Sequence, residues 1–124
     1  MHSSIRYIME FSKDLMAASA TPMLLRILSH SENYGYAIIK AVKELSDNQI
    51  NWTEGMLYPV LHRLEKQNYI MAFWRIAETG RKRKYYQITS EGKDYLRELM
   101  NQWKLVDRTL QKSLDTIDKG DKDV

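Results

Sequence analysis

Four consecutive cations, Arg81 to Lys84, follow Gly80 and are the first candidates for a binding site in this chain. The chain has 19 lysines and arginines against 16 acids, and without these four the balance is 15 against 16. The positive excess therefore depends on one short segment. Cations that neutralise phosphates release condensed counterions, so such a run favours a nucleic-acid backbone as its partner. The alternative is a solvated surface loop.

A helical segment, residues 54–67, lies shortly before these cations. Leu57, Leu61 and Leu64 belong to an apolar stripe at helical spacing, so polar residues such as Arg63 and Lys66 point elsewhere. Two β-prone segments, 70–76 and 85–88, then bracket the glycine and predict a hairpin that carries the cations. A helix followed by a cationic hairpin suggests DNA binding.

The other elements have their own signals. A first helix is expected over 13–29 after a short N-terminal arm, with Pro22 bending or breaking it. A second helix is expected over 36–45, after a polar connection that ends at Gly35. Residues 50–52 suggest a very short strand before Thr53, an N-cap for the third helix. Pro59 predicts a local bend in that helix or a later start.

The last helix is predicted from a cap at Thr89 or Ser90 to about Lys119, with Gly120 as its stop. It carries an a/d heptad stripe that ends before Ser113. Such a stripe requires a partner, either the same helix of a second copy together with the first helix, or the first helix alone. The expected interface residues are Leu96, Leu99, Met100, Trp103, Val106 and Leu110.

Composition excludes several classes of protein. The chain of 124 residues is 44% hydrophobic and 28% charged, as expected for one ordinary globular domain, and has no cysteine for disulfides or thiol chemistry. No apolar run approaches a membrane span and no signal peptide is recognisable, so we expect a cytoplasmic protein. His2, His30 and His62 lie apart without a catalytic carboxylate pattern, and no Gly-rich phosphate loop is present. We therefore expect neither an enzyme nor a bound metal or cofactor.

The order helix, helix, helix, hairpin, helix predicts a mainly α protein with a small β-hairpin, a winged helix-turn-helix followed by a C-terminal dimerisation helix. Residues 1–89 would form the DNA-binding domain with its arm, and residues 90–124 the dimerisation helix and a short polar tail. The chain also resembles the PadR-like transcriptional regulators, in the branch with a single C-terminal helix. The motifs that carry this resemblance are ENYGYAIIKAVKE (32–44), EGMLYPVLHRLEKQNYI (54–70), GRKRKYYQITSEGKDYL (80–96) and QWKLVDRTL (102–110).

This resemblance implies a two-fold dimer that inserts the third helix into successive major grooves, about 34 Å apart, and lays each wing along the backbone or minor groove. Tyr58 would offer its hydroxyl to a phosphate or serve as a core aromatic. Glu54 would accept from a cytosine amino group, or would simply be an acid that the helix dipole favours at the N-terminus. Asn51 and Thr53 would anchor phosphates. Tyr85, Tyr86 and Ile88 would form the packing face of the hairpin rather than stacking platforms for bases. The expected DNA contacts are Asn51, Thr53, Glu54, Met56, Tyr58, His62, Arg63, Lys66, Arg81, Lys82, Arg83 and Lys84.

The motif at 102–110 is especially similar to that of a multidrug-sensing lactococcal member of the family. That similarity implies a central pore in which paired Trp103 indoles sandwich a flat aromatic effector, with Asp107 adding charge complementarity. Pro22 and Arg26 would line the pore, where an inward Arg26 would discourage cationic drugs. The alternative role of Trp103 is to fill the dimer interface.

The expected function is that of a dimeric repressor of a palindromic operator, released by a small aromatic effector. Repression is the default expectation because no further domain that recruits polymerase is evident. The competing interpretation is a winged helix that binds protein or RNA instead of operator DNA. Salt sensitivity together with a preference for a palindromic duplex would separate the two.

Overall fold

The computed structural model describes residues 12–120, with side chains to residue 116. Helices dominate, and a small antiparallel sheet completes the fold, as the sequence predicts. The expected N-terminal arm and polar tail lie outside the described residues. In chain order the elements are α1 (Lys13–His30), β1 (Asn33–Tyr34), α2 (Gly35–Leu45), α3 (Glu54–Lys66), β2 (Ile70–Ile76), β3 (Lys82–Ile88) and α4 (Ser90–Gly120).

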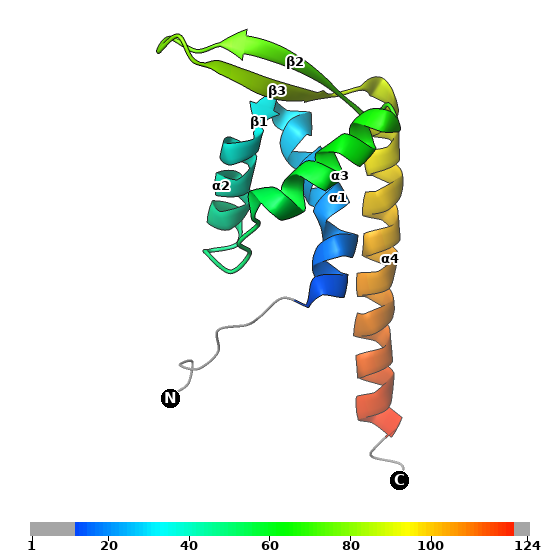
Figure 1. Cartoon of the computed structure of the whole chain (residues 1–124). Helices are drawn as coiled ribbons and strands as arrows, with labels where there is room; N and C mark the ends of the chain where they lie inside the picture. Colours follow the sequence, from blue (N-terminus) through cyan, green and yellow to red (C-terminus); the bar gives the residue numbers. More distant parts are fainter. Residues whose placement is uncertain (1–11, 121–124) are drawn as a thin grey trace.

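The core lies where the first three helices meet each other, the base of the hairpin and the start of α4 (Figure 1). α4 runs beside α1 and extends beyond it (Figure 1). Leu96 in α4 is only 6% exposed, so the first turns of this helix share the core of the winged domain. The fully buried side chains are Leu24, Leu25, Leu28, Ile38, Leu57, Leu61, Leu64 and Ile70.

Helix starts follow the capping residues of the sequence. Thr53 Oγ1 accepts from the backbone N–H of Met56 at 3.2 Å, which places the start of α3 at Glu54. The later start that Pro59 suggested is therefore wrong. α1 also continues through Pro22 without the alternative break. Buried side chains on both sides of each proline, Ala20 and Leu24 around Pro22 and Leu57 and Leu61 around Pro59, hold these helices against the core and offset the missing backbone donor.

The sheet differs from the expected hairpin in two ways. β3 begins at Lys82 rather than Tyr85, so three of the four consecutive cations belong to a strand. Its partner β2 pairs with it in antiparallel register from Ile70–Ile88 to Ile76–Lys82. The sheet also has a third strand, β1, which pairs with the other edge of β3 and was not predicted.

The short strand expected at residues 50–52 is absent, which corrects that prediction. Ile50 and Trp52 are instead buried in the core as part of an irregular connection, 8% and 4% exposed. Their β-prone composition reflects burial between α2 and α3 rather than pairing with another strand.

Candidate nucleic-acid interface

One side of α3 is available to a ligand. The leucine stripe of this helix is buried, so residues between the leucines face outward. Tyr58 is 44% exposed, and the spacing of four residues along the helix aligns this side chain with other polar residues. Because these side chains form one continuous face, α3 presents a polar ridge rather than scattered groups. The exposed residues of this face are Glu54, Tyr58, His62 and Lys66.

The sequence suggests that Arg63 contacts DNA, but in the structure this side chain contacts another helix of the protein. Its Nη2 donates a hydrogen bond of 2.8 Å to Thr21 Oγ1 in α1. Thr21 is 8% exposed, so this bond satisfies a buried hydroxyl and joins α3 to α1. The guanidinium is thus directed toward the protein, and a base contact by Arg63 would require this bond to break.

The residues at the start of α3 have local structural roles. The Thr53 hydroxyl is the helix cap described above, and Asn51 Nδ2 donates to the carbonyl oxygen of Asn48 at 3.0 Å. Met56 is half-buried and packs against the core. Of the predicted contacts in this region, Glu54 and Tyr58 are the ones that face a cavity, described below.

The wing formed by β2 and β3 has two chemically different faces, because side chains alternate along a strand. On the outer face, the guanidinium carbon of Arg83 lies 4.3 Å from the centre of the Tyr34 ring. Arg75 lies 4.6 Å from the centre of the Tyr85 ring and forms an ion pair with Glu32. The arginines of this face are therefore stacked on aromatic rings, which corrects the expectation that Tyr85 shares one packing face with Tyr86.

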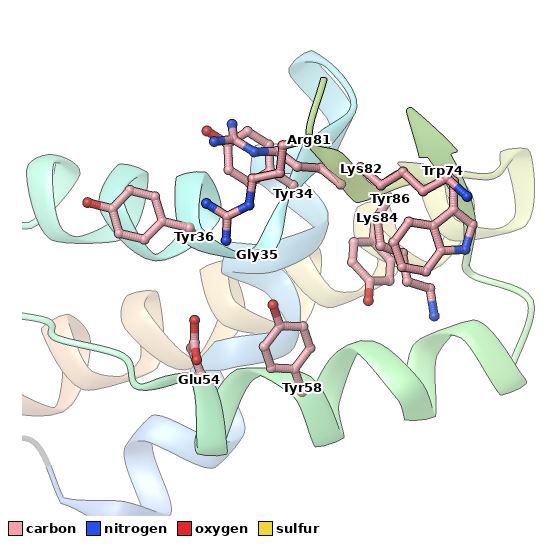
Figure 2. A pocket seen from close by; sticks show the side chains of 11 residues that line it. Tyr34, Gly35, Tyr36, Glu54, Tyr58, Trp74, Arg81, Lys82, Lys84 and Tyr86 are labelled. Atoms are coloured by element: carbon pink, nitrogen blue, oxygen red, sulfur yellow. The ribbon is translucent and has the colours of Figure 1, made fainter. Parts of the chain in front are cut away.

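The inner face of the wing carries Lys82 and Lys84. Cross-strand register places Trp74 opposite Lys84, and Tyr86 lies on the same face. Lys84 Nζ is 4.0 Å from Glu65 Oε1 in α3, a long and half-exposed ion pair that leaves the ammonium group accessible. This face looks toward α3 (Figure 2).

A concave pocket of about 570 Å³ opens between the wing, α3 and the start of α2 (Figure 2). It brings the cationic run together with the exposed start of α3, although these segments are far apart in the sequence. Most of the aromatic residues that line this pocket were not predicted from the sequence. The tyrosines of the NYGY sequence were the signal that could have indicated an aromatic site here. The lining residues are Tyr34, Gly35, Tyr36, Glu54, Tyr58, Trp74, Arg81, Lys82, Arg83, Lys84 and Tyr86.

Tyr86 forms part of the floor of this pocket and is 4% exposed. Burial, with smaller contributions from the charges of Tyr58 and Glu65, raises the pKa of Tyr86 to about 12. Tyr86 therefore keeps its proton at neutral pH. The pocket then presents cations and tyrosine hydroxyls, with Glu54 as its one carboxylate, and this chemistry suits a phosphodiester backbone.

A second hollow, of about 330 Å³, lies between α1 and α4. Three of the four expected effector residues, Pro22, Arg26 and Trp103, line it together with Ser19, Met23 and Met100. Asp107 does not line it and is exposed farther along α4.

Along the expected dimer stripe, burial declines toward the C-terminus. Leu96 is buried, Leu99, Met100 and Trp103 are half-buried, and Val106 and Leu110 are 50% and 62% exposed.

The family model for PadR-like transcriptional regulators matches residues 24–98, which contain all of α3 and the wing. The chain belongs to the PadR-like family. Membership makes it a DNA-binding transcriptional regulator rather than an enzyme. Within residues 12–120 no helix is long and apolar enough to cross a membrane, and no cluster of side chains could hold a metal ion.

Solved structures of PadR-like and other regulators share this fold. A transcriptional regulator from Clostridium thermocellum is 31% identical with a TM-score of 0.74, over 81% of this chain and 97% of that one. A PadR-like regulator from Bacillus cereus is 29% identical with a TM-score of 0.72, over 82% and 97%.

Two known proteins are similar in sequence. An uncharacterised protein of Lysinibacillus sphaericus is 38% identical over 90 residues, 73% of this chain and 83% of its own length. The transcriptional regulator YqjI of Escherichia coli is 29% identical over 89 residues, 72% of this chain but only 41% of YqjI.

Proposed function

We propose that this PadR-like regulator binds a palindromic operator as a homodimer and represses transcription by covering it. The observation that carries the proposal is the common pocket of α3 and the wing, which combines Lys82 and Lys84 with the exposed start of α3. α3 would lie in the major groove while the inner face of the wing follows the backbone. Glu54, Tyr58, His62 and Lys66 would be its groove contacts.

Dimerisation is supported by the lower half of α4. Leu105, Val106, Leu110 and Leu114 are 50–62% exposed, although each is a large apolar side chain. A helix that extends beyond its own domain with such a face is stabilised by a second apolar helix. We assign residues 90–124 to dimerisation, while the first turns of α4 also complete the core of the DNA-binding unit, residues 1–89.

A gel-shift and footprinting experiment on the DNA upstream of the protein's own gene tests this proposal. We expect one protected site with two-fold symmetry and half-sites about one helical turn apart. Transcription in vitro from the same fragment should fall when the site is occupied. An asymmetric or absent footprint on every duplex, together with binding to protein or RNA, would contradict the proposal.

Release by a small aromatic effector is a second part of the proposal, supported by the hollow that Pro22, Arg26 and Trp103 share. An indole wall suits a planar ring, and the cation at Arg26 disfavours a positively charged ligand. An uncharged or anionic planar dye should therefore quench Trp103 fluorescence more than a cationic dye of the same size. The Trp103→Ala variant should lose dye binding while remaining folded. Dye binding that survives this substitution would make Trp103 an interface residue only.

A further inference from the structure

The inner face of the wing carries apolar side chains that the fold does not cover. Trp74 is 64% exposed and Ile76 is 66% exposed, and their cross-strand partners are Lys84 and Lys82. Residues opposite one another in an antiparallel pair share a face of the sheet. On the side that looks toward α3, the wing thus places apolar side chains of β2 beside lysines of β3 (Figure 2).

Trp74 stands apart from the other two tryptophans. Trp52 is 4% exposed in the core, and Trp103 is half-buried in the hollow between α1 and α4. Among the described residues no aromatic ring pairs with Trp74, whereas Phe73 on the outer face of the same strand stacks on Tyr85. Leaving an indole in water forgoes the favourable burial of a large apolar surface. The folded domain alone therefore gives no reason for a tryptophan at this position.

We propose that Trp74 is a duplex-contacting residue, which packs its indole against the deoxyribose sugars between the phosphates that Lys82 and Lys84 neutralise. This inference rests on the proposed DNA binding. The occupant follows from charge: the pocket that Trp74 lines has four cations and one carboxylate, Glu54. A nucleic-acid backbone offers phosphates and apolar sugar faces next to one another, which match the lysines of β3 and the apolar side chains of β2 beside them.

The contact has a distinctive salt dependence. A lysine that neutralises a phosphate releases counterions, so its removal lowers the slope of log affinity against log salt. An indole that packs on a sugar releases none. Loss of Trp74 should weaken binding at every salt concentration by the same factor, whereas loss of Lys82 should weaken it mainly at low salt.

The experiment measures duplex affinity over a range of salt for the full chain, Trp74→Ala, Lys82→Ala and Met71→Ala. Met71 is a matched control because it is half-exposed on the opposite face of the same strand. Trp74→Ala should lose about tenfold in affinity, the size of one good aromatic contact, with an unchanged salt slope. Met71→Ala should bind like the unsubstituted protein.

Fluorine NMR of the protein labelled with 5-fluorotryptophan gives a second measurement, with the Trp74 resonance assigned by its loss in Trp74→Phe. Addition of duplex should shift this resonance. Three results would each overturn the inference. They are a Trp74→Ala affinity within about twofold of the wild type, a Trp74 resonance that duplex does not shift, and a Trp74→Ala salt slope that falls as it does in Lys82→Ala. If the wild type itself binds no duplex, the proposed function fails first, and that outcome is distinct from a defect confined to Trp74→Ala.

Discussion

The hydroxyl of Tyr58 lies directly against Gly35, so that a Cβ at residue 35 would be 2.6 Å from Tyr58 Oη. Gly35 is the first residue of α2, and Tyr58 is on the exposed face of α3. The absence of a side chain at Gly35 therefore allows Tyr58 to point into the pocket under the wing. This contact connects the GY sequence of the second helix with the LY sequence of the third.

Gly35→Ala should lower the free energy of unfolding by about 1 kcal/mol, because the new methyl group displaces the Tyr58 ring. Gly55→Ala is the control, since its nearest neighbour would be Thr53 Oγ1 at 4.0 Å. That substitution should stabilise α3 by up to about 1 kcal/mol through helix propensity. Urea unfolding measures both. In a Tyr58→Ala background the cost at Gly35 should disappear. Equal stabilisation by the two alanines would show that Tyr58 does not constrain residue 35.

The hydrogen bond between Arg63 and Thr21 predicts a coupling between α3 and α1. Arg63→Ala, Thr21→Val and the double variant form a cycle whose coupling energy should be about 1 kcal/mol, as for a part-buried hydrogen bond. Unfolding in urea measures each variant. A coupling near zero would mean that the guanidinium is free to reach DNA, as the sequence suggests.

The exposed apolar side chains of α4 predict which surface forms the dimer interface. Leu110→Asp places a charge in a surface that we expect to be apolar and covered, so it should shift the protein toward monomer and abolish operator binding. Gln111→Asp adds the same charge at the neighbouring exposed position and should leave the dimer intact. Sedimentation equilibrium distinguishes them. An intact Leu110→Asp dimer would place the interface elsewhere.

Burial of Tyr86 predicts a loss of stability at high pH. The pKa of Tyr86 is raised from 10.0 to about 12, so the unfolded chain releases this proton first as pH rises. The stabilising contribution is complete below pH 10 and is lost between 10 and 12. Between about pH 8 and about pH 11 the wild type should therefore lose more unfolding free energy in urea than Tyr86→Phe. Parallel losses in the two proteins would contradict this role of Tyr86.

Sequence periodicity predicted the elements whose residues interact locally. The leucines of α3 and the Thr53 cap lie within a few residues of one another, so their pattern is readable along the chain. β1 has two residues, too few for an alternating pattern, and forms only because β3 offers its free edge. The contacts of Arg63 with Thr21 and of Gly35 with Tyr58 join distant segments, and no local pattern encodes them.

We expect the lysine face of the wing to hold a DNA backbone beside α3. The most direct test is the salt dependence of duplex binding by the wild type, Lys82→Ala and Lys112→Ala, an exposed cation far along α4. Lys82→Ala should lower the slope of log affinity against log salt by about 0.9, the value for one phosphate contact, and Lys112→Ala should leave it unchanged. A Lys82→Ala slope equal to that of the wild type would show that Lys82 neutralises no phosphate and would contradict this placement of the DNA.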